Sequence, residues 1–161
     1  MKCLVFSDSH GNLVNMRAAI RANSDAEVVF FLGDGLGDAD TVALGDRSRA
    51  WLAVAGNWDV NQIFRDGFVM KTDSVTLEGT KIVFTHGDVY RARGSLAGLQ
   101  SLAAEKCADI VLFGHTHEPL ERYIPTERGG YYLFNPGSIG AGSYGLILLT
   151  ESGVLLSHGR I

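Results

Sequence analysis

The sequence has few cysteines, few prolines and no long apolar run, and each shortage excludes a class of protein. Its two cysteines, Cys3 and Cys107, lie within apolar stretches, so nothing indicates a disulfide framework. No apolar segment approaches the roughly 20 residues that a membrane-spanning helix requires. Asp8 interrupts the first apolar run too early for a secretory signal peptide. We therefore expect a cytoplasmic protein that does not associate with a membrane.

The sequence also lacks a basic patch. It has 14 lysines and arginines against 18 aspartates and glutamates, and its formal net charge is −4. We expect no nucleic-acid partner, because phosphate backbones require clustered basic side chains. A chain of this length buries roughly 68–70% of its unfolded surface as one domain. No linker, repeat or biased tract divides it, so we expect a single domain over residues 1–161.

Short apolar runs dominate the secondary-structure pattern. Five of them predict buried strands, at Lys2–Phe6, Glu27–Leu32, Ala50–Ala55, Lys81–Thr85 and Asp109–Phe113. Strands that are apolar throughout indicate a sheet covered on both faces. Helical spacing of apolar residues predicts helices over Asn12–Arg21 and Ser95–Lys106. Runs typical of antiparallel strands occupy Phe68–Leu77, Leu120–Pro125, Gly130–Phe134, Ser143–Thr150 and Val154–His158. The pattern predicts an α/β layered protein whose second sheet is mainly antiparallel.

Polar side chains follow the carboxyl ends of the five predicted strands. They include four of the five histidines, two aspartates and an asparagine: Asp8, His10, Asp34, Asn57, His86, His115 and His117. Residues at such strand ends converge on one crevice of a covered sheet. Carboxylate oxygen and imidazole nitrogen suit manganese, iron, zinc, nickel or cobalt better than calcium or magnesium. Seven ligands exceed the needs of one four-coordinate ion, whereas two ions sharing a carboxylate use them all. Such ion pairs clamp the oxygens of an in-line phosphoryl displacement.

Each motif taken alone also has an ordinary structural interpretation. Asp8-Ser9-His10 precedes a predicted helix and is compatible with an N-cap. Gly33-Asp34-Gly35 resembles part of a phosphate-binding loop, but the glycine spacing departs from G-x-G-x-x-G and the carboxylate repels a pyrophosphate. His115 and His117 point to opposite faces of a regular strand, so both reach the site only if the chain turns at Gly114. The joint occurrence of these motifs at strand ends favours the metal site.

The motifs D-x-H, G-D, G-N, H-G and G-H-x-H, in this order from Asp8 to His117, resemble the calcineurin-like metallophosphoesterase superfamily. The short chain is similar to the small bacterial and archaeal phosphodiesterase branch of that superfamily. The turn Asn135-Pro136-Gly137-Ser138 is a further match. The resemblance implies a four-layer α/β/β/α sandwich with two mixed β-sheets and a dinuclear metal site at one edge. It also implies hydrolysis of a small phosphate ester, a phosphodiester above all.

By motif position, the resemblance assigns the seven polar residues to two metal ions. The first ion would be held by Asp8, His10 and His117. The second ion would be held by Asn57, His86 and His115. Asp34 would bridge the ions, and a hydroxide between them would be the nucleophile. The implied catalytic residues are Asp34, Asn57 and Asp59. Manganese is the usual activator in such families, although the ligands also suit the other ions named above.

The sequence departs from the superfamily at two positions. Most members have a histidine where this chain has Trp58, and that histidine is thought to protonate the leaving oxygen or bind the phosphate. Indole cannot act as a general acid near neutral pH. Trp58 then either packs beside the site and shapes substrate access or pins the turn. Asp59 would act from behind the ligands. Asp88 stands where many relatives have histidine, and it either orients a substrate or is a solvated turn residue.

A second function remains open from the resemblance. The same superfamily includes a retromer subunit that serves mainly as a protein-binding platform, so a scaffold with weak or no catalysis is the alternative to an enzyme. The complete ligand set favours the enzyme. Self-association also remains open, since relatives often form dimers or larger oligomers. Two further interpretations come from the residues themselves: His158 is structural, and the solvated acidic loop contains Asp38, Asp40 and Asp46.

Overall fold

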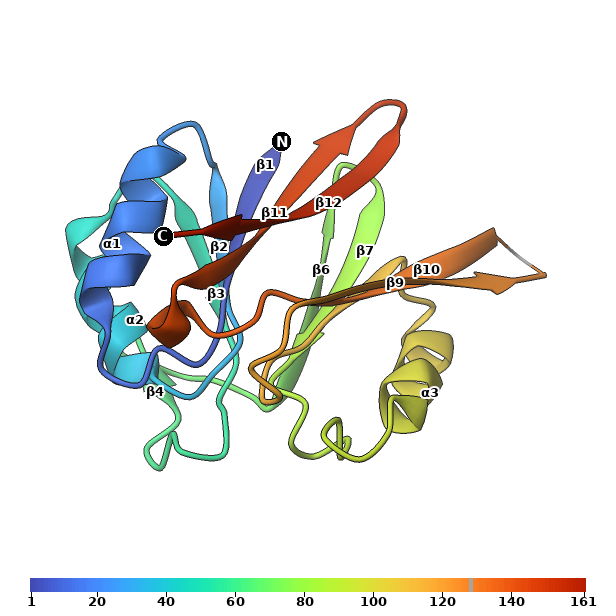
Figure 1. Ribbon diagram of the computed structural model, residues 1–161, viewed down its shortest axis with the longest axis horizontal. Helices are drawn as coiled ribbons and strands as arrows, with labels where there is room; N and C mark the ends of the chain where they lie inside the picture. Colours follow the sequence, from blue (N-terminus) through green and yellow to red (C-terminus); the bar gives the residue numbers. More distant parts are fainter. Residues whose placement is uncertain (128) are drawn as a thin grey trace.

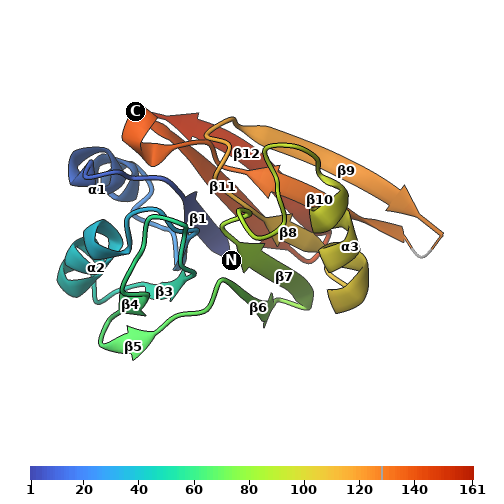
Figure 2. The same cartoon turned by 90° about the horizontal axis from the view of Figure 1, so that it is seen from below.

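The computed structural model describes residues 1–127 and 129–161 as two β-sheets packed face to face between helices. Helices α1 (Leu13–Ala22) and α2 (Leu36–Gly45) lie on the outer side of the first sheet, and α3 (Ala97–Lys106) lies on the outer side of the second (Figures 1 and 2). The layers follow in the order α/β/β/α. This confirms the four-layer sandwich that the sequence resemblance implied.

The first sheet has the strand order β12-β11-β1-β2-β3. Its parallel part consists of β1 (Lys2–Phe6), β2 (Val28–Phe31) and β3 (Ala50–Ala53). Two antiparallel strands complete it, β11 (Ser143–Thr150) and β12 (Gly153–Arg160). The chain therefore returns to β1 at its end, and the last hairpin belongs to the first sheet.

The second sheet has the order β6-β7-β8-β10-β9. Its three central strands are parallel: β7 (Thr80–Thr85), β8 (Ile110–Leu112) and β10 (Gly129–Asn135). The edge strands β6 (Thr72–Leu77) and β9 (Leu120–Thr126) are antiparallel to their neighbours. Both sheets are mixed, as the resemblance implied. The expectation of a mainly antiparallel second sheet was wrong, because β8 inserts between β7 and β10 and runs parallel to both.

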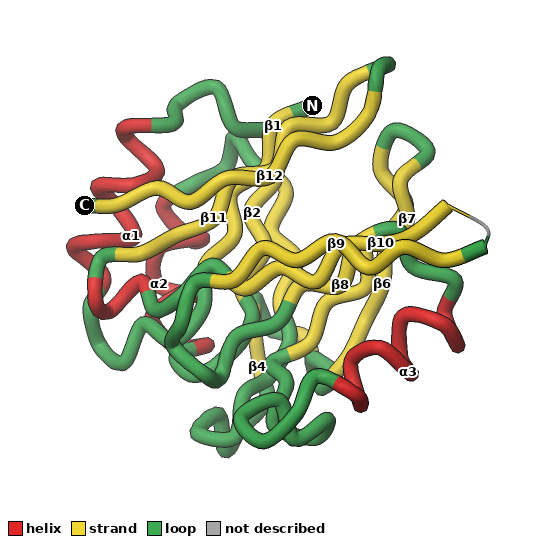
Figure 3. The backbone as a smooth tube through the Cα atoms, turned by 45° about the vertical axis from the view of Figure 1, so that its right-hand side comes forward, coloured by secondary structure: helices red, strands yellow, loops and turns green. Residues whose placement is uncertain are grey.

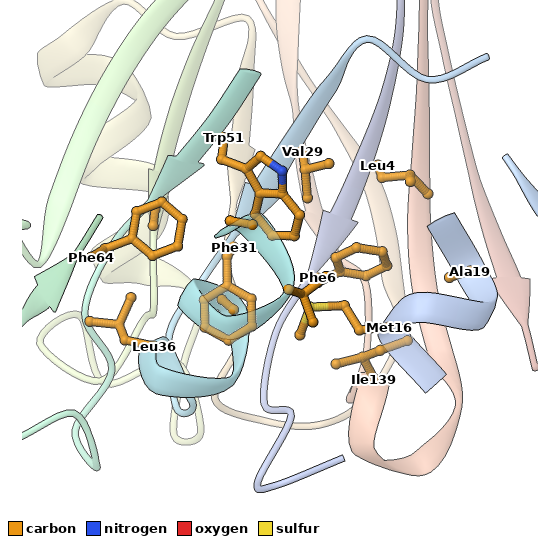
Figure 4. Close-up of a cluster of buried hydrophobic side chains, with 14 of the residues drawn as sticks. Leu4, Phe6, Met16, Ala19, Val29, Phe31, Leu36, Trp51, Phe64 and Ile139 are labelled. Atoms are coloured by element: carbon orange, nitrogen blue, oxygen red, sulfur yellow. The ribbon is translucent and has the colours of Figure 1, made fainter. Parts of the chain in front are cut away.

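The continuous apolar runs are explained by the two faces of the first sheet. Along β1 and β2, Leu4, Phe6, Val29 and Phe31 pack toward the helices, while the alternate residues pack toward the second sheet. Figure 4 shows the helix-facing cluster, in which Met16 of α1 and Leu36 of α2 meet the side chains of the strands. Because successive side chains of a strand point to opposite faces, a strand buried on both faces must be apolar at every position.

Three segments differ from the sequence predictions. Helix α2 was not predicted, and the supposed acidic loop is in part this helix, since Asp38 and Asp40 lie within it. Two glycines and two aspartates in its ten residues hide the apolar periodicity. The strand predicted over Phe68–Leu77 is interrupted: Gly67–Phe68 forms β5 and pairs with β4 (Ile63–Phe64), and β6 begins only at Thr72. The structure also has a short 3₁₀ helix, η1 (Ile139–Ala141).

The loops that follow β1, β2, β3, β7 and β8 gather at one end of the sandwich, at the bottom of Figure 3. This arrangement is expected, because parallel strands place their carboxyl ends at the same edge. Within residues 1–127 and 129–161, no helix is both long and apolar enough to cross a membrane. The end where the loops gather carries the polar residues singled out in the sequence.

Candidate metal centre

The first cluster of polar side chains joins the loop after β1 to the loop after β8. It consists of Asp8, His10 and His117, whose ligand atoms lie within 4.8 Å of one another. His117 Nε2 lies 3.2 Å from Asp8 Oδ1 and 3.4 Å from His10 Nε2. Asp8 is fully buried, whereas both histidines are partly open to solvent. The cluster therefore has a buried carboxyl group at its bottom and two partly exposed histidines at its rim.

The second cluster joins the loops after β2, β3, β7 and β8. It contains Asp34, His86 and His115, with ligand atoms again within 4.8 Å of one another. His86 Nε2 lies 3.3 Å from Asp34 Oδ2 and 3.2 Å from His115 Nδ1. Asn57 Oδ1 lies 3.1 Å from the same His86 nitrogen. The two clusters are linked, because the backbone N–H of His115 donates to Asp8 Oδ2 over 3.1 Å.

The tautomer of His86 follows from its other ring nitrogen. Nδ1 lies 2.8 Å from the carbonyl oxygen of Leu32, and a carbonyl can only accept. Nδ1 therefore carries the proton, and in the neutral ring Nε2 presents a lone pair to the cluster. This is the arrangement in which a histidine binds a metal ion through one nitrogen while a backbone carbonyl orients the other.

The ionisation of the second cluster is strongly coupled. Burial raises the pKa of Asp34, but hydrogen bonds from His86, which donates from Nε2 as well when its ring is protonated, and from the Trp58 backbone N–H outweigh it and hold that pKa below its usual value. Burial lowers the pKa of His86, but the Asp34 carboxylate and the charge of Asp8 raise it above the usual value overall. Burial, followed by the neighbouring charges of His86 and Arg93, lowers the pKa of His115. Asp34 is therefore an anion at neutral pH.

Two observations show that these residues fit divalent cations. Asp8 Oδ1 is a buried carboxylate oxygen that has no hydrogen-bond partner among the described residues. Around His86 Nε2, the Asp34 and Asn57 oxygens and the His115 nitrogen all lie within 3.3 Å. One proton cannot satisfy so many acceptors, whereas a cation accepts lone pairs from all of them. Oxygen and nitrogen donors without thiolates suit manganese, iron, zinc, nickel or cobalt.

Strained backbone is concentrated at the same loops. Five of the seven predicted ligands have left-handed backbone with φ between 44° and 67°: Asp8, His10, Asp34, His115 and His117. Such conformations cost roughly 1–3 kcal/mol each and persist where the surrounding structure enforces them, often at functional sites. The turn expected at Gly114 is present, and it sends His115 to the second cluster and His117 to the first. A Cβ at Gly114 would lie 2.9 Å from Asp8 Oδ2, so glycine is required there.

Asp59 lies behind the second cluster and accepts hydrogen bonds from four backbone N–H groups. Its Oδ2 accepts from the N–H groups of Asp34 and Gly56 over 2.7 and 2.8 Å. Its Oδ1 accepts from Gly35 and Leu36, each over 2.9 Å. The carboxylate therefore ties the loop after β3 to the loop after β2 and to the start of α2. Its position is that of a positioning residue rather than a ligand.

Sequence reasoning missed two polar residues that support the clusters. The Asp38 carboxylate accepts from the Ser9 hydroxyl over 2.6 Å and from the Gly11 N–H over 2.7 Å, so it anchors the loop that carries His10. Lys71 Nζ donates to the Gly56 carbonyl over 2.6 Å. Neither residue has a local sequence signal, because each acts on a loop distant in the chain. The N-cap interpretation of Asp8-Ser9-His10 was wrong, since Asn12 caps α1 by accepting from the Asn15 N–H.

Trp58 is exposed beside the first cluster, whereas Asp88 is largely buried. Trp58 is 73% exposed, and its ring meets His10 edge-on with centroids 6.2 Å apart. Asp88 Oδ2 lies 3.5 Å from Lys71 Nζ. The other carboxylate oxygen, Oδ1, is buried and has no hydrogen-bond partner among the described residues. His158 lies away from the clusters, where it stacks on Phe134 and donates to the Asn135 carbonyl, as a structural residue would.

Comparison with known proteins assigns the chain to a family. The family model for the calcineurin-like phosphoesterase superfamily domain matches residues 1–151. The chain therefore belongs to the calcineurin-like phosphoesterase superfamily, a family of metal-dependent phosphoesterases. This confirms the sequence resemblance.

Individual relatives are moderately similar to the chain. The probable metallophosphoesterase YsnB of Bacillus subtilis is 30% identical and is matched over 86% of this chain and 75% of its own length. The phosphodiesterase YfcE of Escherichia coli is 29% identical over 86% of this chain and 79% of its own. A solved structure of Vps29 from Entamoeba histolytica in complex with Zn²⁺ superposes with a TM-score of 0.75 at 21% identity, covering 99% of each chain. The last comparison shows the shared fold alone.

Proposed function

We propose that the protein is a phosphodiesterase that hydrolyses a small phosphodiester at a dinuclear metal site. The observation that carries this proposal is the pairing of two three-residue ligand clusters at one edge of the sandwich, joined by the hydrogen bond between His115 and Asp8. A purely structural site has no physical need for two such clusters. The phosphodiesterase name of a relative that matches most of the chain supports the same reaction class.

The ligand roles follow the two clusters. Asp8, His10 and His117 would hold one ion, and Asn57, His86 and His115 the other. Asp34, the anion at the second cluster, would bridge them. When bound, such ions polarise the phosphoryl oxygens and make water a strong nucleophile at neutral pH. We propose manganese as the native ion because it is the usual activator in the family that the sequence resembles, while the oxygen and nitrogen donors suit it as they suit iron, zinc, nickel or cobalt. We further propose that the protein is cytoplasmic and consists of one domain over residues 1–161, and self-association remains open.

The remaining residues near the site would position the metal ligands or the substrate rather than bind metal themselves. Asp59 fixes the backbone on both sides of Asp34 and so presets the bridging geometry. Lys71 holds the Gly56 carbonyl beside Asn57 and places a positive charge near Asp88. Asp88 Oδ1 is buried and has no hydrogen-bond partner among the described residues, so Asp88 would act on the site only through its contact with Lys71. Trp58 has no titratable proton in the neutral range, so its contribution would be to substrate binding.

A scaffold without catalysis is the second candidate. The likeness to the Vps29 fold favours it, together with exposed apolar side chains near the site, at Trp58, Val60, Phe68 and Met70. The two candidates differ in turnover, because a scaffold gains nothing from hydrolysis.

A direct test compares an activated diester with the matching monoester. Metal-loaded protein would be assayed on bis-(p-nitrophenyl) phosphate and on p-nitrophenyl phosphate, with the chelator-treated protein as control. The proposal predicts metal-dependent turnover that is faster for the diester. Preference for the monoester would make the protein a phosphomonoesterase, and no turnover of either compound by fully loaded protein would favour the scaffold.

A further inference from the structure

The side chain of Trp58 is not needed for the turn in which it lies. The backbone N–H of this residue stabilises the turn by donating to Asp34 Oδ1 over 2.8 Å, and any residue except proline offers that donor. The ring itself is 73% exposed, whereas the chain's other tryptophan, Trp51, is 8% exposed and packs in the core. The indole of Trp58 therefore supports neither the core nor the turn, and its faces are accessible to a ligand.

Trp58 forms one wall of a cavity and also contacts His10 of the first metal cluster. Its ring meets His10 at an interplanar angle of 85°. The cavity has a volume of about 500 Å³, and its other walls include Leu36, Val60 and Ile63. Val60 and Ile63 are 89% and 56% exposed, so the apolar surface is open to a ligand. Cavities of roughly 300–1,000 Å³ are typical of small-molecule sites.

The described lining of this cavity presents no free charge. Asp59 is its one ionisable residue, and both carboxylate oxygens are occupied by backbone N–H donors. The polar lining residues Asn61 and Gln62 are neutral amides, which offer both donors and acceptors. A charged group would find no opposite charge here, whereas a neutral ring gains apolar contact on its faces and amide partners at its edge.

We propose that Trp58 and this cavity form a subsite for a neutral planar aromatic group, such as a nucleobase or an aryl ring, carried on the phosphodiester. The proposal rests on the proposed function, since His10 would hold the ion that binds the phosphoryl group. An aromatic group linked to that phosphoryl group would reach Trp58, because the centroids of the indole and His10 rings lie 6.2 Å apart. Aromatic pairs in offset or edge-on contact gain free energy beyond the burial of area.

Binding of phosphonates tests the subsite without turnover. Phenylphosphonate and methylphosphonate have the same charged group and a stable carbon–phosphorus bond, so they differ only in the ring. Calorimetric titration of the zinc-loaded protein should give phenylphosphonate about tenfold higher affinity. Phenylphosphonate should also change the emission of the exposed Trp58, since Trp51 is buried. Trp58→Ala should remove the preference, and Trp58→Phe should retain most of it.

A matched control and a kinetic comparison complete the test. Leu155→Ala removes another exposed apolar side chain, which is 63% exposed and lies in β12, and should leave the preference intact. The p-nitrophenyl ester of thymidine 5′-phosphate and methyl p-nitrophenyl phosphate share one leaving group. The ratio of their kcat/KM values should fall by about tenfold in Trp58→Ala.

The outcomes separate this proposal from the proposed function. Hydrolysis of both esters at a ratio that Trp58→Ala does not change would overturn the subsite and leave the phosphodiesterase standing. A preference for phenylphosphonate that depends on Trp58, without hydrolysis of any ester, would support the subsite and refute the enzyme. Equal affinity for the two phosphonates would overturn the subsite.

Discussion

Asp59 and Asp34 lie side by side at the site, and the Asp59 carboxylate accepts the backbone N–H of Asp34 over 2.7 Å. Two carboxylates are thereby held close together: Asp34 faces the histidines of the second cluster, and Asp59 faces backbone N–H donors. Asp59 satisfies three further N–H groups, of Gly35, Leu36 and Gly56. The geometry of the second metal cluster therefore depends on a residue that does not belong to it.

Asp59→Asn should weaken metal binding while leaving every predicted ligand in place. An asparagine keeps one oxygen but points an NH₂ group at two N–H donors, which costs about 1–3 kcal/mol of folding stability. Loss of such a supporting carboxylate typically lowers metal affinity by about 10–100-fold. Metal competition with a chelator and thermal unfolding measure the two effects. Asp66→Asn, an exposed aspartate in the β4–β5 turn, is the control, and equal behaviour of the two variants would contradict this role for Asp59.

Asp38→Ala should selectively weaken the first metal cluster, because Asp38 anchors Ser9 and Gly11 on either side of His10. We expect a loss of about 10–100-fold in affinity for one of the two ions. The matched control is Asp40→Ala, in the same helix, since Asp40 also accepts a backbone N–H, that of Arg65, over 2.7 Å. Titration of metal into each apo-variant distinguishes the ions. An unchanged first cluster in Asp38→Ala would refute the anchoring role.

Trp58→His should change how the rate depends on the leaving group. With Trp58 the site has no general acid at this position, so esters with acidic leaving groups should react fastest and alkyl esters poorly. A histidine offers a proton in the neutral range, and general-acid help is worth about 10²–10⁴-fold. The plot of log kcat/KM against leaving-group pKa, for a series of aryl and alkyl diesters, should therefore be shallower in the variant. Equal turnover of alkyl and aryl esters by the natural protein would contradict this account.

Asp46 should make stability depend on pH. Burial raises the pKa of this carboxyl, but hydrogen bonds from Ser48, Trp51 and Arg49 outweigh it and hold the pKa below its usual value. A group with a lowered pKa stabilises the folded state above its unfolded value of about 3.9, and this contribution disappears as the pH falls through the folded value.

The difference in unfolding free energy between the natural protein and Asp46→Asn should thus be constant near neutral pH, at about 1–3 kcal/mol. It should shrink below about pH 4. Urea unfolding across this range measures it. Asp25→Asn, at an exposed ion pair with Lys2, is the control and should show a smaller difference. A difference for Asp46→Asn that does not depend on pH would refute the assignment.

Much of the fold was predictable because its strands are buried on both faces. Lys2–Phe6 was predicted with the observed bounds, since a short apolar run between polar or glycine residues is typical of a buried strand. Ser143–Thr150 was also predicted with the observed bounds, as an antiparallel strand. Helix α2 was not predictable by the same logic, because its glycines and aspartates interrupt the apolar pattern. One of these aspartates, Asp38, accepts a hydrogen bond from Ser9 in the loop after β1. The pairing of β11 with β1 is a contact between the two ends of the chain and has no local signal.

The candidate site was predictable to the extent that its residues follow strand ends. Sheet topology alone places these ends together, so the two clusters emerge from short motifs. The supporting residues were not predictable, because Lys71 precedes β6 and acts on the loop after β3 through a single hydrogen bond to Gly56. The left-handed backbone at Asp8 and His117 also could not be predicted from the sequence, since strain of this kind is enforced by the surrounding packing.

The central claim is a dinuclear site bridged by Asp34, and metal content measures it most directly. The protein would be purified without chelator, supplied with manganese, and analysed for metal per chain together with turnover of bis-(p-nitrophenyl) phosphate. Asp34→Asn would be measured in parallel. The account predicts close to two ions per chain, with a reduced content and a large loss of activity in Asp34→Asn. One ion or none in the natural protein, or full activity in Asp34→Asn, would contradict it.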